Sequence, residues 1–133
     1  MKRILLAYDG TDPSRRALEQ AAELASALKA ELSVVSVIPA RLGPAPLDPW
    51  DDREVHDQAL LEARKLLTER GIEPRLLEPA GDPARTIEHI AAEGQFDMVV
   101  IGSRGLGTVG RLLEGSVSEH VATHALQTVV VVH

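Results

Sequence analysis

The sequence predicts an α/β fold: one domain over residues 1–133, built on a parallel sheet of five strands with helices on both faces. Short apolar runs typical of buried parallel strands alternate along the whole chain with amphipathic, helix-type stretches. This βαβαβαβαβ order places the strands parallel. The chain has one Phe, one Tyr and one Trp, so its core has to consist of Leu, Val, Ile and Ala, as in helices packed on a buried sheet.

The first part of the chain predicts a strand, a helix and a second strand. Ile4 to Tyr8 is a short apolar run. Asp12 and Pro13 then indicate a helix start, with Asp12 as the N-cap and Pro13 at the first helical position. Alanines and leucines recur at helical spacing up to about Ala30, and the second strand covers Leu32 to Ile38.

The middle of the chain predicts a long loop, a helix and an edge strand. Four prolines exclude regular structure from residues 39–50. This long loop is either a lid over a ligand or a surface loop anchored by the Trp50 side chain. A helix runs from about Asp51 to Arg70 and stops at Gly71. Arg75 to Glu78 stands between two prolines, which favours a short strand at the edge of the sheet.

The last part of the chain completes the alternation. Asp82 and Pro83 repeat the helix start seen at Asp12 and Pro13, and a short apolar stripe follows. The remaining elements are a strand over Phe96 to Ile101, a helix from Val117 to about Ala125 and a strand over Val129 to Val132.

Charge and composition exclude several classes of function. Asp and Glu outnumber Lys and Arg by 20 to 14, and an acidic surface repels phosphate backbones, so no nucleic-acid partner is expected. No apolar run approaches the ~20 residues that span a bilayer, and the N-terminus lacks a signal-peptide core. We therefore expect a cytoplasmic protein without a membrane segment. The absence of cysteine excludes thiolate metal sites.

Glycines concentrate after the fourth predicted strand, in the pattern Gly102-x2-Gly105-x9-Gly115-Ser116. Glycine lets a backbone approach a ligand closely, and the first turn of a helix offers unpaired N–H groups to phosphate. Ser116 and Glu119 match a capping box, which places the helix start at Ser116. The pattern indicates a phosphate-binding loop; the alternative is a glycine-rich surface loop with an ordinary N-cap.

Other nucleotide-binding motifs do not fit. The chain has no P-loop sequence and no pyrophosphatase loop after the first strand. Gly105-x-Gly107-x-x-Gly110 matches the dinucleotide fingerprint by letter. It follows the fourth strand, however, and no acidic residue lies on the strand about 20 residues further on.

With these motifs the chain resembles the universal stress protein family over nearly its whole length. Ala7 to Thr11 is similar to the family's strand-then-Asp-Gly-Ser/Thr opening, Val34 to Pro39 to its V-x-V segment, and Gly102 to Ser116 to the signature of its ATP-binding branch. The resemblance implies a Rossmann-like, adenine nucleotide alpha hydrolase-like open sheet of order 3-2-1-4-5. In that order ligand binds at the carboxyl ends of strands 1 and 4.

The resemblance also implies a set of binding residues. Asp9 would meet the ribose or a bound Mg or Mn ion; a general base and an Asx turn are the alternatives for this residue. Val37 would offer backbone hydrogen bonds to adenine. The implied contacts are Ala7, Tyr8, Val37 and Ile101 around the adenine, Gly102, Gly105, Gly115, Ser116, Val117 and Ser118 around the ribose and phosphates, and Arg104 and Arg111 within reach of the phosphates.

The predicted function is that of a small ATP-binding universal stress protein, a nucleotide-dependent sensor or regulator in the stress response, with a regulatory protein partner that the sequence does not define. We expect a homodimer through Val129 to Val132, although Thr128 stands where the family usually has proline. No catalytic residue is assigned. A slow ATPase or phosphotransferase using the same site, and a nucleotide-free interaction module, remain alternatives.

Two further patterns favour structural roles. His120 and His124 lie four residues apart on one predicted helix, a spacing that can bind metal, but no third ligand is evident and a partly exposed helix face is the preferred interpretation. Ser116 has no adjacent base that would make it a nucleophile.

Overall fold

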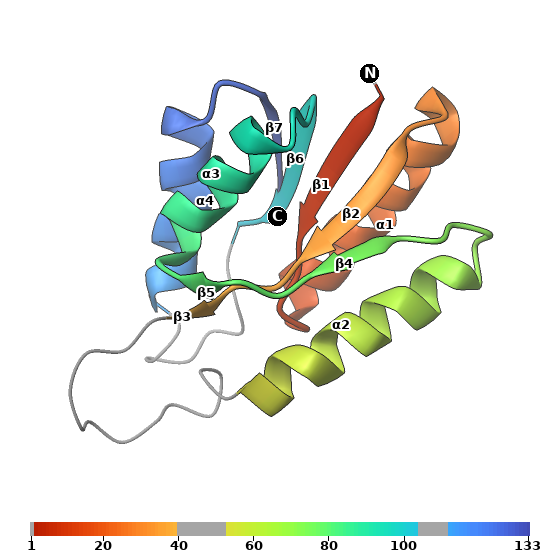
Figure 1. Cartoon of the computed structure of the whole chain (residues 1–133), viewed down its shortest axis with the longest axis horizontal. Coiled ribbons are helices and arrows are strands. Elements are labelled where there is room, and N and C mark those ends of the chain that lie inside the picture. The colour runs from red at the N-terminus through yellow and green to blue at the C-terminus, as the bar shows by residue number, and fades with distance from the viewer. Residues whose placement is uncertain (1, 40–52, 104–111) are drawn as a thin grey trace.

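The computed structural model of the chain describes residues 2–39, 53–103 and 112–133. Its main sheet has five parallel strands in the order β4-β2-β1-β6-β7, which is the predicted order 3-2-1-4-5 (Figure 1). The α/β fold class is therefore confirmed. The five strands are β1 (Arg3–Ala7), β2 (Glu31–Val35), β4 (Arg75–Leu77), β6 (Met98–Gly102) and β7 (Thr128–Val132).

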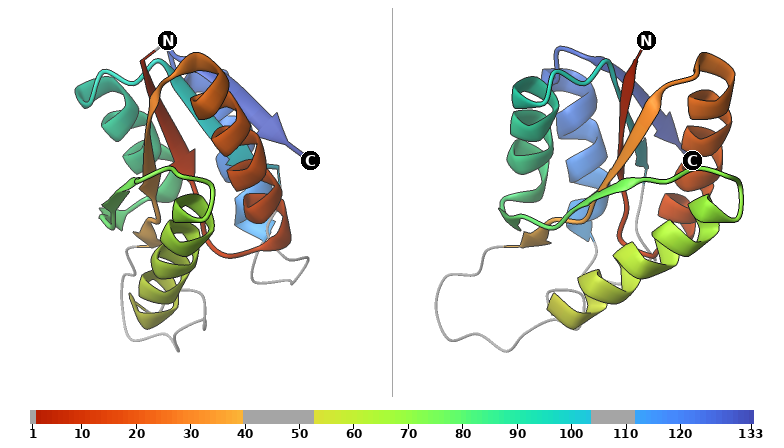
Figure 2. Two further views of the ribbon diagram at one scale, coloured as in Figure 1. Left: turned by 90° about the vertical axis from the view of Figure 1, so that its right-hand side faces the viewer. Right: turned by 45° about the vertical axis from the view of Figure 1, so that its right-hand side comes forward.

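In the described part of the chain, two helices cover each face of this sheet, as the views in Figures 1 and 2 illustrate. Successive residues of a strand point to opposite faces. In β1, Ile4 and Leu6 therefore join the core on one face, whereas Leu5 and Ala7 join the core on the other. The first face is covered by α1 (Asp12–Leu28) and α2 (Arg53–Thr68), and the second by α3 (Pro83–Glu93) and α4 (Leu112–His124).

The two Asp-Pro helix starts differ in detail. At α3 the prediction is confirmed, because the Asp82 carboxylate accepts a hydrogen bond from the Arg85 N–H at 3.0 Å. At α1 the N-cap is Thr11, one residue earlier than predicted. Asp12 lies in the first turn instead, where its charge favours the positive end of the helix dipole.

The second predicted strand is divided in two. β2 ends at Val35, and β3 (Ile38–Pro39) pairs with β5 (Ala80–Gly81) in a separate two-stranded parallel sheet that the sequence did not predict. The division follows from the neighbouring strand: β1 and β2 are last in register at Ala7 and Val35, after which the chain of β1 turns away toward α1.

The prediction for the start of α4 is wrong. The helix begins at Leu112, not at Val117, so Ser116 lies inside it and cannot be its N-cap. Leu112, Leu113 and Glu114 are good helix formers, and they extend the helix through Gly115 although glycine costs about 1 kcal/mol there relative to alanine.

Several predictions fall partly outside the described residues. Of the loop predicted for residues 39–50, only Pro39 is described, and it belongs to β3. The rest of that loop lies outside the described residues. Arg104, Gly105 and Arg111 also lie outside. Among the described residues, no helix combines the length and apolar character needed to cross a membrane.

Gly102, the last residue of β6, lies directly against the first turn of α1. A Cβ atom at this position would come within 2.8 Å of the Pro13 carbonyl carbon and within 2.9 Å of its carbonyl oxygen. Because these are backbone atoms, they cannot rotate out of the way. Glycine is therefore required for the close packing of β6 against α1, independently of any role in binding a ligand.

Replacing Gly102 by alanine should lower the free energy of unfolding by about 1–3 kcal/mol, because the added methyl group forces β6 and α1 apart. Urea unfolding of Gly102→Ala and of the parent chain, compared at equal m-value, measures the difference. Coincident unfolding curves would contradict the contact with Pro13.

Candidate functional site

The carboxyl ends of β1 and β6 lie side by side at the centre of the sheet. The helices that follow these strands in sequence lie on opposite faces, α1 after β1 on one face and α4 after β6 on the other. In open parallel sheets this divergence leaves a crevice in which ligands bind. The predicted residues Asp9 and Gly102 lie at these two ends.

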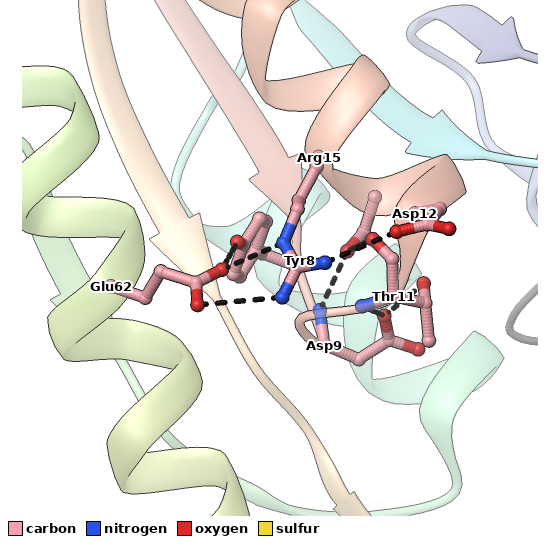
Figure 3. Close-up of polar contacts among 7 residues, drawn as sticks. Tyr8, Asp9, Thr11, Asp12, Arg15 and Glu62 are labelled. Atoms are coloured by element: carbon pink, nitrogen blue, oxygen red, sulfur yellow. Dashed lines mark hydrogen bonds and ion pairs between the residues drawn. The ribbon is translucent and has the colours of Figure 1, made fainter.

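Asp9 shapes the turn between β1 and α1 (Figure 3). Its Oδ1 accepts hydrogen bonds from the Thr11 N–H at 3.0 Å and from the Thr11 hydroxyl at 2.5 Å. Gly10 between them has φ +82°, which suits glycine. The Ser14 hydroxyl donates to the Thr11 carbonyl at 2.9 Å. The Asx turn is therefore confirmed for Asp9, and contact of this residue with a ribose or a metal ion stays a prediction.

Tyr8 forms a polar cluster with Arg15 of α1 and Glu62 of α2 (Figure 3). Its hydroxyl donates to the Glu62 carboxylate, which also accepts a 3.0 Å hydrogen bond from Arg15 Nε. Burial, followed by the bond to the Glu62 carboxylate, raises the pKa of Tyr8. Burial opposes ionisation of Glu62, but the hydrogen bonds from Arg15 and Tyr8 outweigh it and lower the pKa of Glu62. The cluster ties α2 to α1 beside the end of β1.

The residues predicted to border adenine separate into two groups. Ala7, Val37 and Ile101 are buried in the core cluster that faces α3 and α4, and the half-buried Val117 packs against the same cluster. The Tyr8 side chain belongs to the opposite cluster, against α1 and α2. The structure therefore brings three of the four predicted residues together and leaves only the Tyr8 backbone beside them.

The backbone groups of Val37 face the β1 side of the sheet, beyond the last paired residue of β1. The residues on either side of it donate to the β4 side of the sheet, Ser36 N–H to the Leu77 carbonyl at 3.0 Å and Ile38 N–H to the Pro79 carbonyl at 2.9 Å. Since alternate residues of an extended chain point their N–H and C=O groups to opposite sides, those of Val37 point toward the side that β1 has left.

The predicted phosphate residues on α4 occupy different positions from those expected. Ser118 is buried, and its hydroxyl donates to the Ser103 carbonyl at 3.0 Å, which fixes α4 against the end of β6. Gly115 and Ser116 lie within the helix. Only the first N–H groups of a helix lack partners, so those of α4 precede Gly115.

Sequence reasoning missed a buried polar pair near the end of β2. The Ser36 hydroxyl lies 2.6 Å from Nδ1 of His56, and both side chains are buried. Glu78 lies at the end of β4, where burial and then a hydrogen bond with Asp57 raise its pKa against the effect of Arg53, which is 2.8 Å away. These contacts join α2 to two strands, and no local sequence pattern signals them.

The histidine pair on α4 has a third neighbour that the sequence did not reveal. Glu88 of α3 approaches His120, and its Oε2 lies 2.6 Å from His120 Nδ1. Within the described residues Glu88, His120 and His124 form a group whose ligand atoms lie within 4.8 Å of one another. Glu88 precedes His120 by 32 residues, so only the packing of α3 on α4 brings them together.

A cavity of about 570 Å³ opens elsewhere on the sheet. Arg3, Arg75, His89 and Phe96 contribute to its lining, together with the end of β4. Of the predicted site residues that the structure describes, none lines this cavity, so it is separate from the ends of β1 and β6.

The arrangement defines a doubly wound parallel α/β protein with its candidate site at the topological switch point. The sequence model of the universal stress protein family matches residues 1–133. A universal stress protein of Thermus aquaticus is 38% identical over 133 residues, which cover 93% of each chain. The chain therefore belongs to the universal stress protein family.

Solved structures agree with this assignment. A universal stress protein from Archaeoglobus fulgidus has a TM-score of 0.80 at 26% identity and covers 100% of this chain and 99% of its own. A universal stress protein in complex with cAMP has a TM-score of 0.77 at 25% identity, with 99% and 97% of the two chains covered.

Tyr8 should ionise at a higher pH than an unperturbed tyrosine. Its folded-state pKa is raised above the ordinary value of 10.0, so the stability it contributes is complete below that pH and is lost as the pH rises through the folded-state pKa. Tyr8 is the only tyrosine in the chain, so an absorbance titration of the phenolate follows it alone.

Glu62→Gln should lower the pKa of Tyr8 toward its ordinary value, because the charge next to the hydroxyl is removed while burial remains. Glu69→Gln, an exposed change just beyond α2, serves as the control and should leave the titration unchanged. Identical titrations of the parent and Glu62→Gln would contradict the hydrogen bond between Tyr8 and Glu62.

Proposed function

We propose that this chain is an ATP-binding universal stress protein that acts as a nucleotide-dependent sensor or regulator. The observation that carries the proposal is the Val37 backbone, whose N–H and C=O groups point toward the side of the sheet that β1 leaves after Ala7. Ala7 and Ile101 border the same place with apolar side chains. A flat, apolar ring with hydrogen-bonding edges, such as adenine, suits these surroundings.

The glycine signature after β6 supports phosphate binding. Gly102, Gly105 and Gly115 follow the spacing of the family's ATP-binding branch, and a relative of this chain has been solved in complex with cAMP. We propose Asp9 as the contact to the ribose or to an Mg or Mn ion, and Arg104 as a phosphate contact. One nucleotide-binding domain over residues 1–133, and a location in the cytosol, remain part of the prediction.

Binding through the amides of Ser116, Val117 and Ser118 requires a change at the start of α4. These amides lie inside the helix that begins at Leu112, so they become donors to phosphate only when the first turn opens. Nucleotide binding would then change the residue at which α4 begins. A helix that changes its start with the ligand provides the linkage through which a regulator responds to nucleotide.

Calorimetric titration of the nucleotide-stripped protein with MgATP should give saturable binding at one site per chain. Gly115→Glu should weaken it at least tenfold, because the carboxylate repels and displaces phosphate. Ala122→Glu adds the same charge on the exposed face of the same helix and should bind as the parent does. Equal affinities for the parent and Gly115→Glu would contradict the site.

The same preparation separates the two alternatives. A slow ATPase would release phosphate steadily, and faster than an Asp9→Ala variant does. A nucleotide-free interaction module would show neither heat on titration nor a change in melting temperature at millimolar MgATP.

The edge strand β7 supports the proposed homodimer. The Ser103 N–H donates to the Val132 carbonyl at 2.8 Å, so Val132 and the residues at even spacing from it point their backbone groups toward β6. Val129 and Val131 then point their N–H and C=O groups to the open edge of the sheet. An apolar edge with unpaired backbone groups is suited to pairing with a second copy.

Val131→Pro should convert the dimer to a monomer, because it removes an outward N–H while leaving the bonds to β6 in place. Val131→Ala keeps the N–H and should remain dimeric. Light scattering after size exclusion at micromolar concentration gives the mass of each variant. A monomeric parent chain, or a dimeric Val131→Pro variant, would contradict pairing through β7.

A further inference from the structure

Glu88 of α3 and two histidines of α4 form a compact polar group on the helical face away from α1. The imidazole rings of His120 and His124 are stacked, with centroids 4.0 Å apart and an angle of 20° between their planes. The group is accessible: the side chains of Glu88 and His120 are 19% and 39% exposed, and His124 is exposed.

Hydrogen bonds fix which ring nitrogen of each histidine carries a proton. Nδ1 of His124 lies 2.9 Å from the His120 carbonyl oxygen, which can only accept, so this Nδ1 is the donor. Nδ1 of His120 lies 2.6 Å from the Glu88 carboxylate and is likewise the donor. In the neutral rings both Nε2 atoms therefore carry the lone pair, which is the form that ligates a metal ion.

The backbone adds the spacing that chelation needs. Residues four apart on a helix lie on the same face, and this is the separation at which two histidines of one helix share a zinc ion in metalloproteases. A carboxylate that accepts from Nδ1 while Nε2 faces the metal is the usual support of a zinc-bound histidine. Glu88 stands in that relation to His120.

We propose that Glu88, His120 and His124 form a binding site for a divalent transition-metal ion, of which Zn²⁺ fits best. An imidazole lone pair lies in the plane of its ring, so the exposed His124 ring turns out of the stack for both Nε2 atoms to face one ion. Glu88 orients His120 and supplies negative charge, and water completes the coordination. Two imidazoles favour zinc over magnesium or calcium, which prefer oxygen ligands. The site joins α3 to α4 and is separate from the crevice at the ends of β1 and β6.

The site should be tested with ZnCl₂ on tag-free, nucleotide-free protein, by calorimetry and by thermal unfolding. We expect one Zn²⁺ per chain and a melting temperature that rises with its concentration. Co²⁺ as a second probe should give the visible absorption of a nitrogen-ligated ion. The chain has no cysteine, so thiolates contribute nothing to either signal.

His120→Ala and His124→Ala should each weaken zinc binding at least tenfold. Glu88→Gln keeps an acceptor for Nδ1 but loses the charge, and should weaken it by about 10–100-fold. His89→Ala is the matched control, since this exposed histidine of α3 lies next to Glu88 in sequence and lines the cavity instead. The absence of saturable binding by the parent, or an equal loss in His89→Ala, would overturn the proposal.

Discussion

The central strand β1 is buried on both faces, and the other elements are arranged around it. Leu5 and Leu6 are each fully inaccessible to solvent, one in the core under α3 and α4 and the other in the core under α1 and α2. Because burial of apolar surface is the main favourable term in folding, this strand contributes to both cores at once. Its departure from the sheet after Ala7 also opens the crevice beside β6, so the same strand provides stability and positions the site.

The sequence was sufficient for the features that depend on local pattern and on the order of elements. Apolar runs identified four strands of the main sheet, and flanking prolines identified the edge strand at Arg75 to Glu78. The Asp-Pro pairs located two helix starts to within a residue. Errors arose at the ends of elements. At α4 the helix-forming residues from Leu112 to Glu114 outweigh the capping box at Ser116, and β2 stops at Val35 because its neighbour β1 leaves the sheet.

The candidate site was predictable in its position but only partly in its contacts. Parallel topology places Asp9 and Gly102 at one edge of the sheet wherever the order 3-2-1-4-5 holds. In contrast, Glu62 reaches Tyr8 from 54 residues away and Glu88 reaches His120 from 32 residues away. Charged residues are common on helix surfaces, and nothing in their local sequence distinguishes the ones that packing brings to a partner.

Helix α2 is held by polar contacts as well as by apolar burial. Its buried apolar residues are two leucines and two alanines, and polar contacts at Glu62, Arg53 and His56 complete its attachment. The ion pairs of Glu62 with Arg15 and of Arg53 with Glu78 each have an exposed arginine, so water replaces these two contacts at small cost. Partial opening of the molecule should therefore begin with α2, which would uncover the Tyr8 side of the core while β1, β6 and the α3–α4 layer stay folded. In amide hydrogen exchange, the N–H groups of α2 would then exchange together and with low protection. The N–H groups of β1 and β6 would stay protected for longer.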